Sequence, residues 1–346
     1  MNIKNQLVIC MLLALVLLTA ACGNTTVNEN ANKEAIGSAQ TEEAAAPLET
    51  EAPSDAFVPQ TVVDASGTEL EFTEPITKIA CVVSLCIDVL VELGLEPVAI
   101  AESGVRTIAT EPEFYGDNGK KFASIGGSFF EPNLEDIVTA KPDLVIGLMG
   151  VHDALREGLN GAAPVYLAQP KTYSDSIAVL ETIGKLTGKT VEAKTAGDHF
   201  LAKLESAKQK APKDKKALIM YGTDVNFAIV TDSGLGGSVL KEVSHYPFQV
   251  KDPSEDPYGE GSIPYSLEKL LEEDPDAIFI ESYSYSPGTK PLSEQMAELP
   301  LWSKLKAVKE NKVIEVRSPI WGDGRGTRSL GILLDESLQF LYPDLF

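Results

Sequence analysis

Short apolar segments alternate with helical patterns over most of this chain, and this alternation constrains the fold more than any other feature. Residues 79–83, 97–101 and 143–146 are almost wholly apolar, and helical patterns lie between them. Strands with continuous apolar sequence are buried on both faces, as in parallel sheets covered by helices. The pattern therefore predicts an α/β fold with mainly parallel sheets flanked by helices.

The alternation runs twice, on either side of one long helical pattern. That pattern covers about residues 190–210 and ends before Pro212, because proline cannot continue a helix. We therefore expect two α/β lobes, residues 58–188 and 212–346, joined by a helix at residues 189–211. A chain of 346 residues is long enough for two hydrophobic cores.

The N-terminal region carries export signals. The apolar run at residues 7–21 is too short to span a bilayer as a helix of about 20 residues, so residues 1–21 are predicted to be a signal peptide. Cys22 directly follows small residues, as at a bacterial lipoprotein processing site, and would carry the lipid. An ordinary signal peptide with a chance cysteine is the alternative. Residues 22–57 are predicted to be a disordered, acidic tether, because they cannot bury enough apolar surface to fold.

The chain is strongly acidic, with 51 Asp and Glu residues, 29 Lys and Arg residues and a formal charge of -22. A protein that binds nucleic acid needs a basic face, so no nucleic-acid partner is expected. The tether holds about -6 of this charge and Lys4 of the signal peptide adds +1, which leaves about -17 on the folded part. Against this background the scarce arginines are informative. They are Arg106, Arg156, Arg317, Arg325 and Arg328.

Most of these arginines follow predicted strands, where a ligand would lie. Loops at the carboxyl ends of parallel strands form the ligand crevice of open α/β sheets. Arg106 and Arg317 each follow a strand, and Arg325 and Arg328 lie in a glycine-rich segment before the last helix. Guanidinium groups suit carboxylate or catecholate oxygens, so these four are predicted to bind an anionic ligand. Surface ion pairing is the alternative, and it is expected for Arg156.

Three aromatic side chains are candidates for stacking on that ligand. Trp321 begins the glycine-rich segment, and Tyr283 and Tyr285 follow the strand predicted near residue 280. Packing within the protein is the alternative for an aromatic side chain beside a helix. Phe129 and Phe130 are expected to pack locally.

The side chains of the chain itself offer no evident metal or catalytic site. His152, His199 and His245 are scattered without the spacing of metal ligands. Cys81 and Cys86 are expected to be buried, inert thiols; a mutual disulfide is the second alternative, and haem or iron ligation is the third. The sequence also lacks the hydrolase motifs GxSxG and HExxH.

One segment recurs at a constant offset of 133 residues. Residues 133–146 and 266–279 each hold an N-cap residue, a short helix, a Pro-Asp pair and an apolar strand. Glu135 and Glu268 occupy the same place in the two copies. Spacing alone favours the simple explanation that each glutamate stabilises the N-terminus of its helix through the helix dipole.

These features together resemble a known family, the lipid-anchored substrate-binding proteins of ATP-driven importers for ferric siderophores, haem and cobalamin. The resemblance runs from about Pro59 to the C-terminus. It is carried by residues 79–83, 90–94, 97–100, 131–135, 141–146 and 301–313, in that order. The lipoprotein signal before them strengthens it.

The resemblance implies two lobes bridged by one long helix, with the ligand in the cleft between them. It also implies that one exposed glutamate on each lobe, here Glu135 and Glu268, docks onto arginines of an ABC permease that works with an ATPase. The chain would be an extracytoplasmic, membrane-anchored, monomeric binding protein, with no enzymatic activity and no cofactor. The expected ligand is an anionic ferric siderophore that brings its own metal. Haem or cobalamin are the alternatives, and a membrane-tethered α/β enzyme is the alternative of another class.

Overall fold

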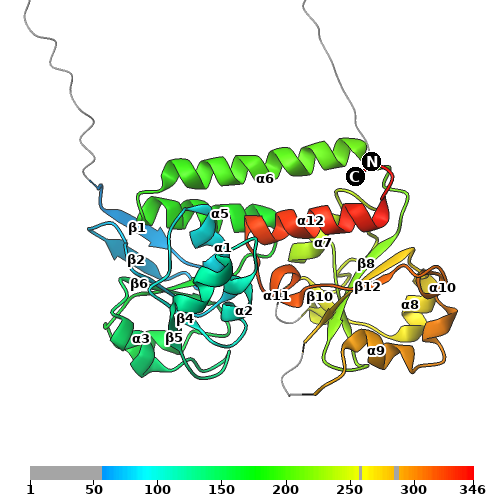
Figure 1. The fold of residues 1–346 in the computed structure, drawn as a ribbon, viewed down its shortest axis with the longest axis horizontal. Coiled ribbons are helices and arrows are strands. Elements are labelled where there is room, and N and C mark those ends of the chain that lie inside the picture. Colours follow the sequence, from blue (N-terminus) through cyan, green and yellow to red (C-terminus); the bar gives the residue numbers. More distant parts are fainter. Residues whose placement is uncertain (1–56, 257–258, 284–287) are drawn as a thin grey trace, which may run out of the picture. The chain divides into compact units, whose positions relative to one another are not determined.

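The computed structural model describes residues 57–256, 259–283 and 288–346. Within these ranges, two separate five-stranded sheets form the centres of two α/β lobes (Figure 1). The predicted signal peptide, the predicted lipidation residue Cys22 and all but the last residue of the predicted tether lie outside the described residues. None of the described helices has both the length and the apolar character that crossing a membrane requires.

The first lobe begins with a β-hairpin and continues into a fully parallel sheet. The hairpin strands are β1 (Gln60–Val63) and β2 (Glu69–Phe72). The sheet has the order β5-β4-β3-β6-β7. Its strands are β3 (Ile79–Cys81), β4 (Ala99–Ala101), β5 (Ala123–Ile125), β6 (Leu144–Leu148) and β7 (Val165–Ala168). The helices are α1 (Ser84–Glu92), α2 (Val105–Thr110), the 3-10 helix η1 (Gly116–Lys121), α3 (Leu134–Ala140), α4 (Leu155–Leu159) and α5 (Tyr173–Leu186).

The second lobe has a mixed sheet with the order β10-β9-β8-β11-β12. Strands β8, β11 and β12 are parallel, whereas β9 is antiparallel to both of its neighbours. The strands are β8 (Ala217–Gly222), β9 (Ala228–Val230), β10 (Ser262–Pro264), β11 (Ala277–Ser282) and β12 (Val313–Glu315). The helices are α7 (Leu235–Leu240), η2 (Pro253–Glu255), α8 (Leu267–Glu273), α9 (Leu292–Ala297), η3 (Trp302–Lys304), α10 (Lys306–Lys309) and α11 (Ser318–Trp321). The prediction of mainly parallel sheets is confirmed, with β9 as the exception.

Two long helices connect the lobes. Helix α6 (Thr190–Lys210) lies where the long helix is predicted, and it packs against α5 and against α12 (Thr327–Leu341) (Figure 1). Its buried residues recur every three or four positions, as one packed helix face requires: Ala193, Gly197, Phe200, Leu204 and Ala207. The contact with α5 is close at Gly184, where a Cβ atom would lie 2.5 Å from the Cβ of Ala193.

The two recurrent segments fold alike. Helix α3 leads into β6 in the first lobe, and α8 leads into β11 in the second. Asn133 caps α3 by accepting a hydrogen bond from the backbone N–H of Glu135 at 2.8 Å. Ser266 caps α8 by accepting from the backbone N–H of Lys269 at 3.3 Å. These caps explain why both helices begin where the sequence pattern places them.

Cys81 and Cys86 form a disulfide. Cys81 ends β3, Cys86 lies in the first turn of α1, and both side chains are fully buried. The turn between strand and helix brings their Cα atoms to 5.3 Å, within the range that a disulfide needs. The expectation of two inert thiols is therefore wrong, and the second alternative is correct.

Candidate ligand-binding site

The segment at residues 317–328, which ends in the glycine-rich stretch, lies against loops of the first lobe. Arg317 follows β12, and its guanidinium donates to the carboxylates of Glu111 at 3.1 Å and Glu113 at 3.0 Å, both just after α2. Further along the segment, a Cβ atom at Gly104 would lie 3.9 Å from Oδ2 of Asp323. Gly104 follows β4, so the contacts join loops at the carboxyl ends of strands from both sheets. Open α/β sheets bind ligands at this edge.

Arg317 has three carboxylate partners. Besides Glu111 and Glu113, it pairs with Glu336 of α12 at 2.5 Å. All four side chains are partly exposed, so the ion pairs are reached by solvent. An anionic ligand would have to displace these carboxylates before it could bind Arg317. The structure thus assigns Arg317 a contact between the lobes.

Arg328 is held by the first lobe in a similar way. Its guanidinium pairs with Glu92 of α1 at 3.0 Å and donates to the backbone oxygen of Glu113 at 3.0 Å. The fully buried Asp88 of α1 accepts hydrogen bonds from the backbone N–H groups of Arg328 at 3.1 Å and Ser329 at 2.8 Å. A side chain of the first lobe therefore caps the N-terminus of α12. Burial raises the pKa of Asp88 to about 7, although these hydrogen bonds oppose the shift.

The approach of Gly326 to Asp88 makes this cap possible. A Cβ atom at position 326 would lie 2.1 Å from Oδ1 of Asp88, so any other residue would push α1 and α12 apart. The glycine of the sequence motif thus serves the contact between two helices. In the described conformation a carboxylate of the protein occupies the helix N-terminus.

Arg325 differs from the other arginines. Within the described ranges, each of Arg106, Arg156, Arg317 and Arg328 has an ion pair, and Arg325 has none. Its backbone is in the left-handed region, with φ 61°, a conformation that is uncommon for a residue with a side chain. The hydroxyl of Ser176 in α5 donates to the backbone oxygen of Arg325 at 2.7 Å and helps to hold this conformation.

Two acids, the buried Glu281 and the partly buried Asp323, lie in the electrostatic field of Arg325. Glu281 is at the end of β11 and is 4% exposed. Burial and, to a smaller extent, the Asp323 carboxylate raise its pKa to about 8, and the charge of Arg325 partly opposes them. Burial also raises the pKa of Asp323 to about 6, again opposed by Arg325. The Tyr283 hydroxyl lies 3.5 Å from Oε2 of Glu281, whereas the predicted stacking residue Tyr285 lies outside the described ranges.

Arg106 is held by its own loop. Its Nε donates to Glu102 at 2.8 Å, and another nitrogen donates to the backbone oxygen of Gly119 at 2.7 Å. These contacts favour the ion-pair alternative over the predicted ligand contact. Arg156 pairs with the buried carboxylate of Asp64, so the expected ion pair is confirmed.

Trp321 is part of the core of the second lobe. Its side chain is 2% exposed, and its ring lies 5.0 Å from that of Phe279, centroid to centroid. The indole N–H donates to Glu336 at 2.6 Å. In this conformation Trp321 is packed in the core, as the packing alternative describes, and its stacking on a ligand stays a prediction.

The described residues contain no group of three side chains suited to hold a metal ion. His152 is buried; its Nδ1 accepts from the backbone N–H of Leu148 at 3.1 Å, and its Nε2 lies 2.8 Å from the backbone oxygen of Phe129. The ring of Phe129 packs edge-on against His152, so Phe129 packs locally as predicted. Phe130 contacts Phe129 but is 59% exposed.

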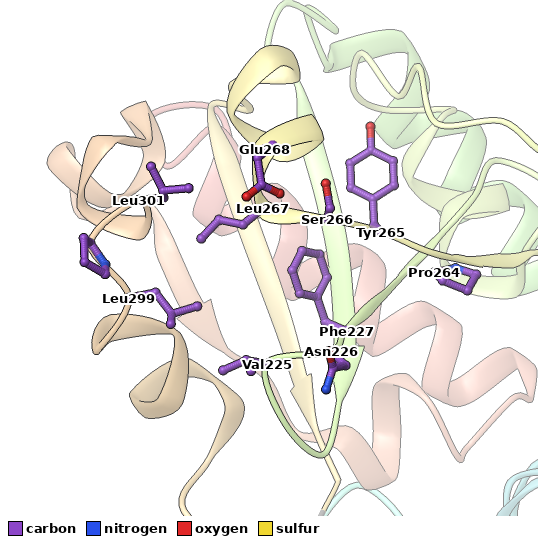
Figure 2. Close-up of a pocket in the computed structure, with 11 residues that line it drawn as sticks. Val225, Asn226, Phe227, Pro264, Tyr265, Ser266, Leu267, Glu268, Leu299 and Leu301 are labelled. Atoms are coloured by element: carbon purple, nitrogen blue, oxygen red, sulfur yellow. The ribbon is translucent and has the colours of Figure 1, made fainter.

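Glu135 and Glu268 are both exposed on the first turns of their helices. Neither carboxylate has an ion pair among the described residues, so both charges are available to a partner. Figure 2 shows Glu268 at a groove of about 500 Å³ that is lined mainly by apolar side chains. The geometry is compatible with the predicted docking role and equally with a simple helix dipole effect.

Comparison with known proteins identifies the fold family. A family model described as periplasmic binding protein matches residues 79–320, more than half of the chain. The chain belongs to the periplasmic binding protein family. This family consists of substrate-binding proteins.

Two Bacillus subtilis proteins and one solved structure illustrate the relationship. YfmC, a Fe(3+)-citrate-binding protein, is 29% identical over 260 residues, which cover 74% of this chain and 78% of YfmC. YhfQ carries the name of an ABC transporter substrate-binding lipoprotein. It is 26% identical over 344 residues, which cover 96% of this chain and 97% of YhfQ. Staphylococcus aureus SirA, solved with staphyloferrin B, is 21% identical and has a TM-score of 0.67, covering 82% of this chain and 98% of SirA. The two-lobed α/β fold is thereby confirmed.

In this periplasmic binding protein, the sequence predicted the arginines as candidate site residues but not the acidic residues that surround them. Asp88 interrupts the otherwise apolar first half of α1, and a buried charge is costly unless it has a partner. Glu281 directly follows four apolar residues of β11, at the edge where a ligand is expected. At both positions, an acidic residue within an apolar segment could have been recognised from the sequence as a candidate site residue. No local pattern connects Glu111 or Glu113 with Arg317, since that pairing depends on the contact between the lobes.

Proposed function

We propose that this periplasmic binding protein captures an anionic ferric siderophore outside the membrane and delivers it to an ABC permease. The guanidinium of Arg325, which has no ion pair with any residue that the structure describes, is the observation that carries the proposal. In a chain of charge -22, a cation without an ion-pair partner at the carboxyl edge of a sheet would attract an anionic chelate. The acidic partners of the other arginines leave Arg325 as the best anchor.

The two local acids differ at neutral pH, because Asp323, with its pKa raised only to about 6, is largely ionised and offsets part of the charge of Arg325. Glu281 is largely protonated at neutral pH, because its pKa is raised to about 8. It therefore does not cancel the charge of Arg325. The hydroxyl of Tyr283 donates to Oε2 of Glu281 at 3.5 Å, so these two groups contact one another beside Arg325.

The named ligands of relatives support an iron chelate over the alternatives. YfmC is named for Fe(3+)-citrate and SirA was solved with staphyloferrin B. Haem and cobalamin remain alternatives to be tested. Capture and delivery require no bond chemistry, so we infer that the protein is not an enzyme and needs no cofactor of its own.

Titration of the full chain with ferric citrate, haem and cobalamin tests the proposal. Buried Trp302 and Trp321 report on the second lobe, and a ferric chelate bound nearby should quench their fluorescence with one-to-one stoichiometry. Recovery of the intact chelate distinguishes binding from turnover. If ferric citrate and a panel of ferric siderophores all fail to bind, the iron assignment is wrong.

Arg325→Ala tests the proposed anchor. Loss of a charge-assisted contact should weaken binding of the ferric chelate by roughly tenfold or more. Arg106→Ala is the matched control, because Arg106 already has an ion pair, and it should change affinity by less than about twofold. Equal affinities of the chain and Arg325→Ala would remove Arg325 from the site.

Docking and anchoring complete the proposed role. We propose that Cys22 carries a lipid that holds the protein at the extracytoplasmic face of the membrane, and that Glu135 and Glu268 pair with cations of the permease. The double variant Glu135→Lys, Glu268→Lys should retain ligand affinity and lose most uptake of the labelled ferric chelate by cells. Unchanged uptake would return both glutamates to the helix dipole explanation.

A further inference from the structure

The groove beside Glu268 is built from three segments of the second lobe. They are the turn between β8 and β9, the start of α8, and the link between α9 and η3 (Figure 2). Its volume is about 500 Å³. The lining residues are Val225, Asn226, Phe227, Pro264, Tyr265, Ser266, Leu267, Glu268, Leu299, Pro300 and Leu301. Seven of these are aliphatic, proline or phenylalanine residues, and Glu268 is the single charged one.

The groove exposes apolar surface that a protein free in water has no reason to keep open. Val225 is 40% exposed, and Leu267, Leu299 and Leu301 are partly exposed along the walls. An apolar hollow with one charged group at its rim is the pattern of a protein interaction site. An apolar side chain fits the hollow, and a neighbouring cation fits the carboxylate of Glu268.

The first lobe presents apolar side chains beside Glu135 as well, but in a different form. Leu134 and Val138 on α3 are 37% and 47% exposed, and Phe130 before the helix is 59% exposed. The pocket near Glu268 is a hollow, whereas these three side chains are prominent on the surface. The two glutamates are equivalent in the sequence repeat, yet their apolar surroundings differ.

We propose that the groove binds an apolar side chain of the permease, one that lies next to the cation that pairs with Glu268. The proposal rests on the proposed docking function and specifies its chemistry on the second lobe. The ion pair between Glu268 and the permease cation attracts the two proteins over a longer distance, and the groove provides shape complementarity to the apolar side chain at short range. Because the apolar surface described beside Glu135 consists of exposed side chains, the groove also distinguishes the second lobe from the first for the permease.

A binding experiment without ligand tests this inference. The full chain is titrated against the importer complex of the same cells, reconstituted in lipid nanodiscs. Leu301→Gln places a polar group in the groove, and Leu201→Gln makes the same change on the exposed face of α6, where Leu201 is 42% exposed. We expect Leu301→Gln to weaken binding by about fivefold or more, and Leu201→Gln by less than twofold.

A second pair guards against a folding defect. Val225→Asn changes an exposed groove residue in a turn, and Val191→Asn changes a residue of α6 that is 75% exposed. Both should melt within a few degrees of the unchanged chain, and only Val225→Asn should weaken binding to the importer. In a double-mutant cycle, Val225→Asn and Glu268→Gln should be non-additive, because one docked segment contacts both positions.

The outcomes separate the two proposals. If Glu268→Lys weakens binding and both groove variants match their α6 controls, the groove inference is wrong and the docking function stands. If Glu135→Lys and Glu268→Lys together have no effect, or if the chain does not bind the importer, the docking function fails and the groove inference falls with it. Weakening by the groove variants and by Glu268→Lys supports both.

Discussion

Glu281→Gln should make the protein more stable at alkaline pH and leave it nearly unchanged at acid pH. Glu281 is 4% exposed at the end of β11, and its described hydrogen-bond contact is the Tyr283 hydroxyl at 3.5 Å. Burial and the Asp323 carboxylate raise its pKa to about 8, and the charge of Arg325 only partly opposes them. Glutamine has nearly the same shape and cannot ionise, so the substitution removes the titration and little else.

The magnitude follows from the difference between the folded and unfolded states. An unfolded chain loses the proton of this residue near its ordinary pKa of 4.5, whereas the folded chain keeps it to about pH 8. Between these values the folded state binds more protons, so stability falls as the pH rises through this window. At about 1.4 kcal/mol for each pKa unit, the loss amounts to roughly 4–5 kcal/mol. The variant should be spared this loss.

Urea denaturation, followed by tryptophan fluorescence at pH 5, 6, 7 and 8.5, measures the effect. The free energy of unfolding of Glu281→Gln should lie within about 1 kcal/mol of the unchanged chain at pH 5 and exceed it by about 4 kcal/mol at pH 8.5. Glu268→Gln is the control, because that carboxylate is exposed, and it should change stability by less than about 0.5 kcal/mol at every pH. A difference that stays constant from pH 5 to pH 8.5 would mean that Glu281 is ionised throughout, and the reasoning would fail.

Two further predictions concern the contacts that hold α1 in place. Asp88→Ala leaves the backbone N–H groups of Arg328 and Ser329 without their acceptor and should lower the free energy of unfolding by about 2–4 kcal/mol; a loss below 0.5 kcal/mol in urea denaturation would show that α12 needs no cap. Replacing Cys81 and Cys86 by serine should cost about 2 kcal/mol, because the disulfide closes a short loop. Dithiothreitol should lower the urea midpoint of the unchanged chain and leave that of the double variant where it is.

The fold was predictable because its central strands are buried on both faces. Residues of β3, β4 and β6 are apolar without interruption. The N-cap residues predicted from the sequence, Asn133 and Ser266, are also the N-cap residues of α3 and α8 in the structure. Strand β5 was missed because its edge position leaves two of its three residues exposed. The antiparallel pairing of β9 was also missed, since an apolar run does not specify strand direction.

The candidate site was harder to predict because it depends on distant pairings. Arginines that follow strands look alike in sequence, yet Arg106 pairs with a residue four positions away and Arg317 with residues about two hundred positions away. Only Arg325 emerges without an ion-pair partner among the described residues. Trp321 illustrates the same limit, because an aromatic residue beside a glycine is equally compatible with the core and with a ligand.

The contacts between the lobes limit how the protein is able to move when it binds a ligand. Separating α1 from α12 would break two buried hydrogen bonds of Asp88, at a cost of several kcal/mol. Releasing Arg317 would break ion pairs that solvent reaches, each worth about 1 kcal/mol or less. A motion that keeps the Asp88 cap and opens the Arg317 contacts is therefore the least costly one. Arg325 lies three residues before Arg328 in the chain, and its backbone oxygen is held by Ser176. Under the proposed function, the ligand would therefore meet a preorganised cation while the Arg317 contacts rearrange.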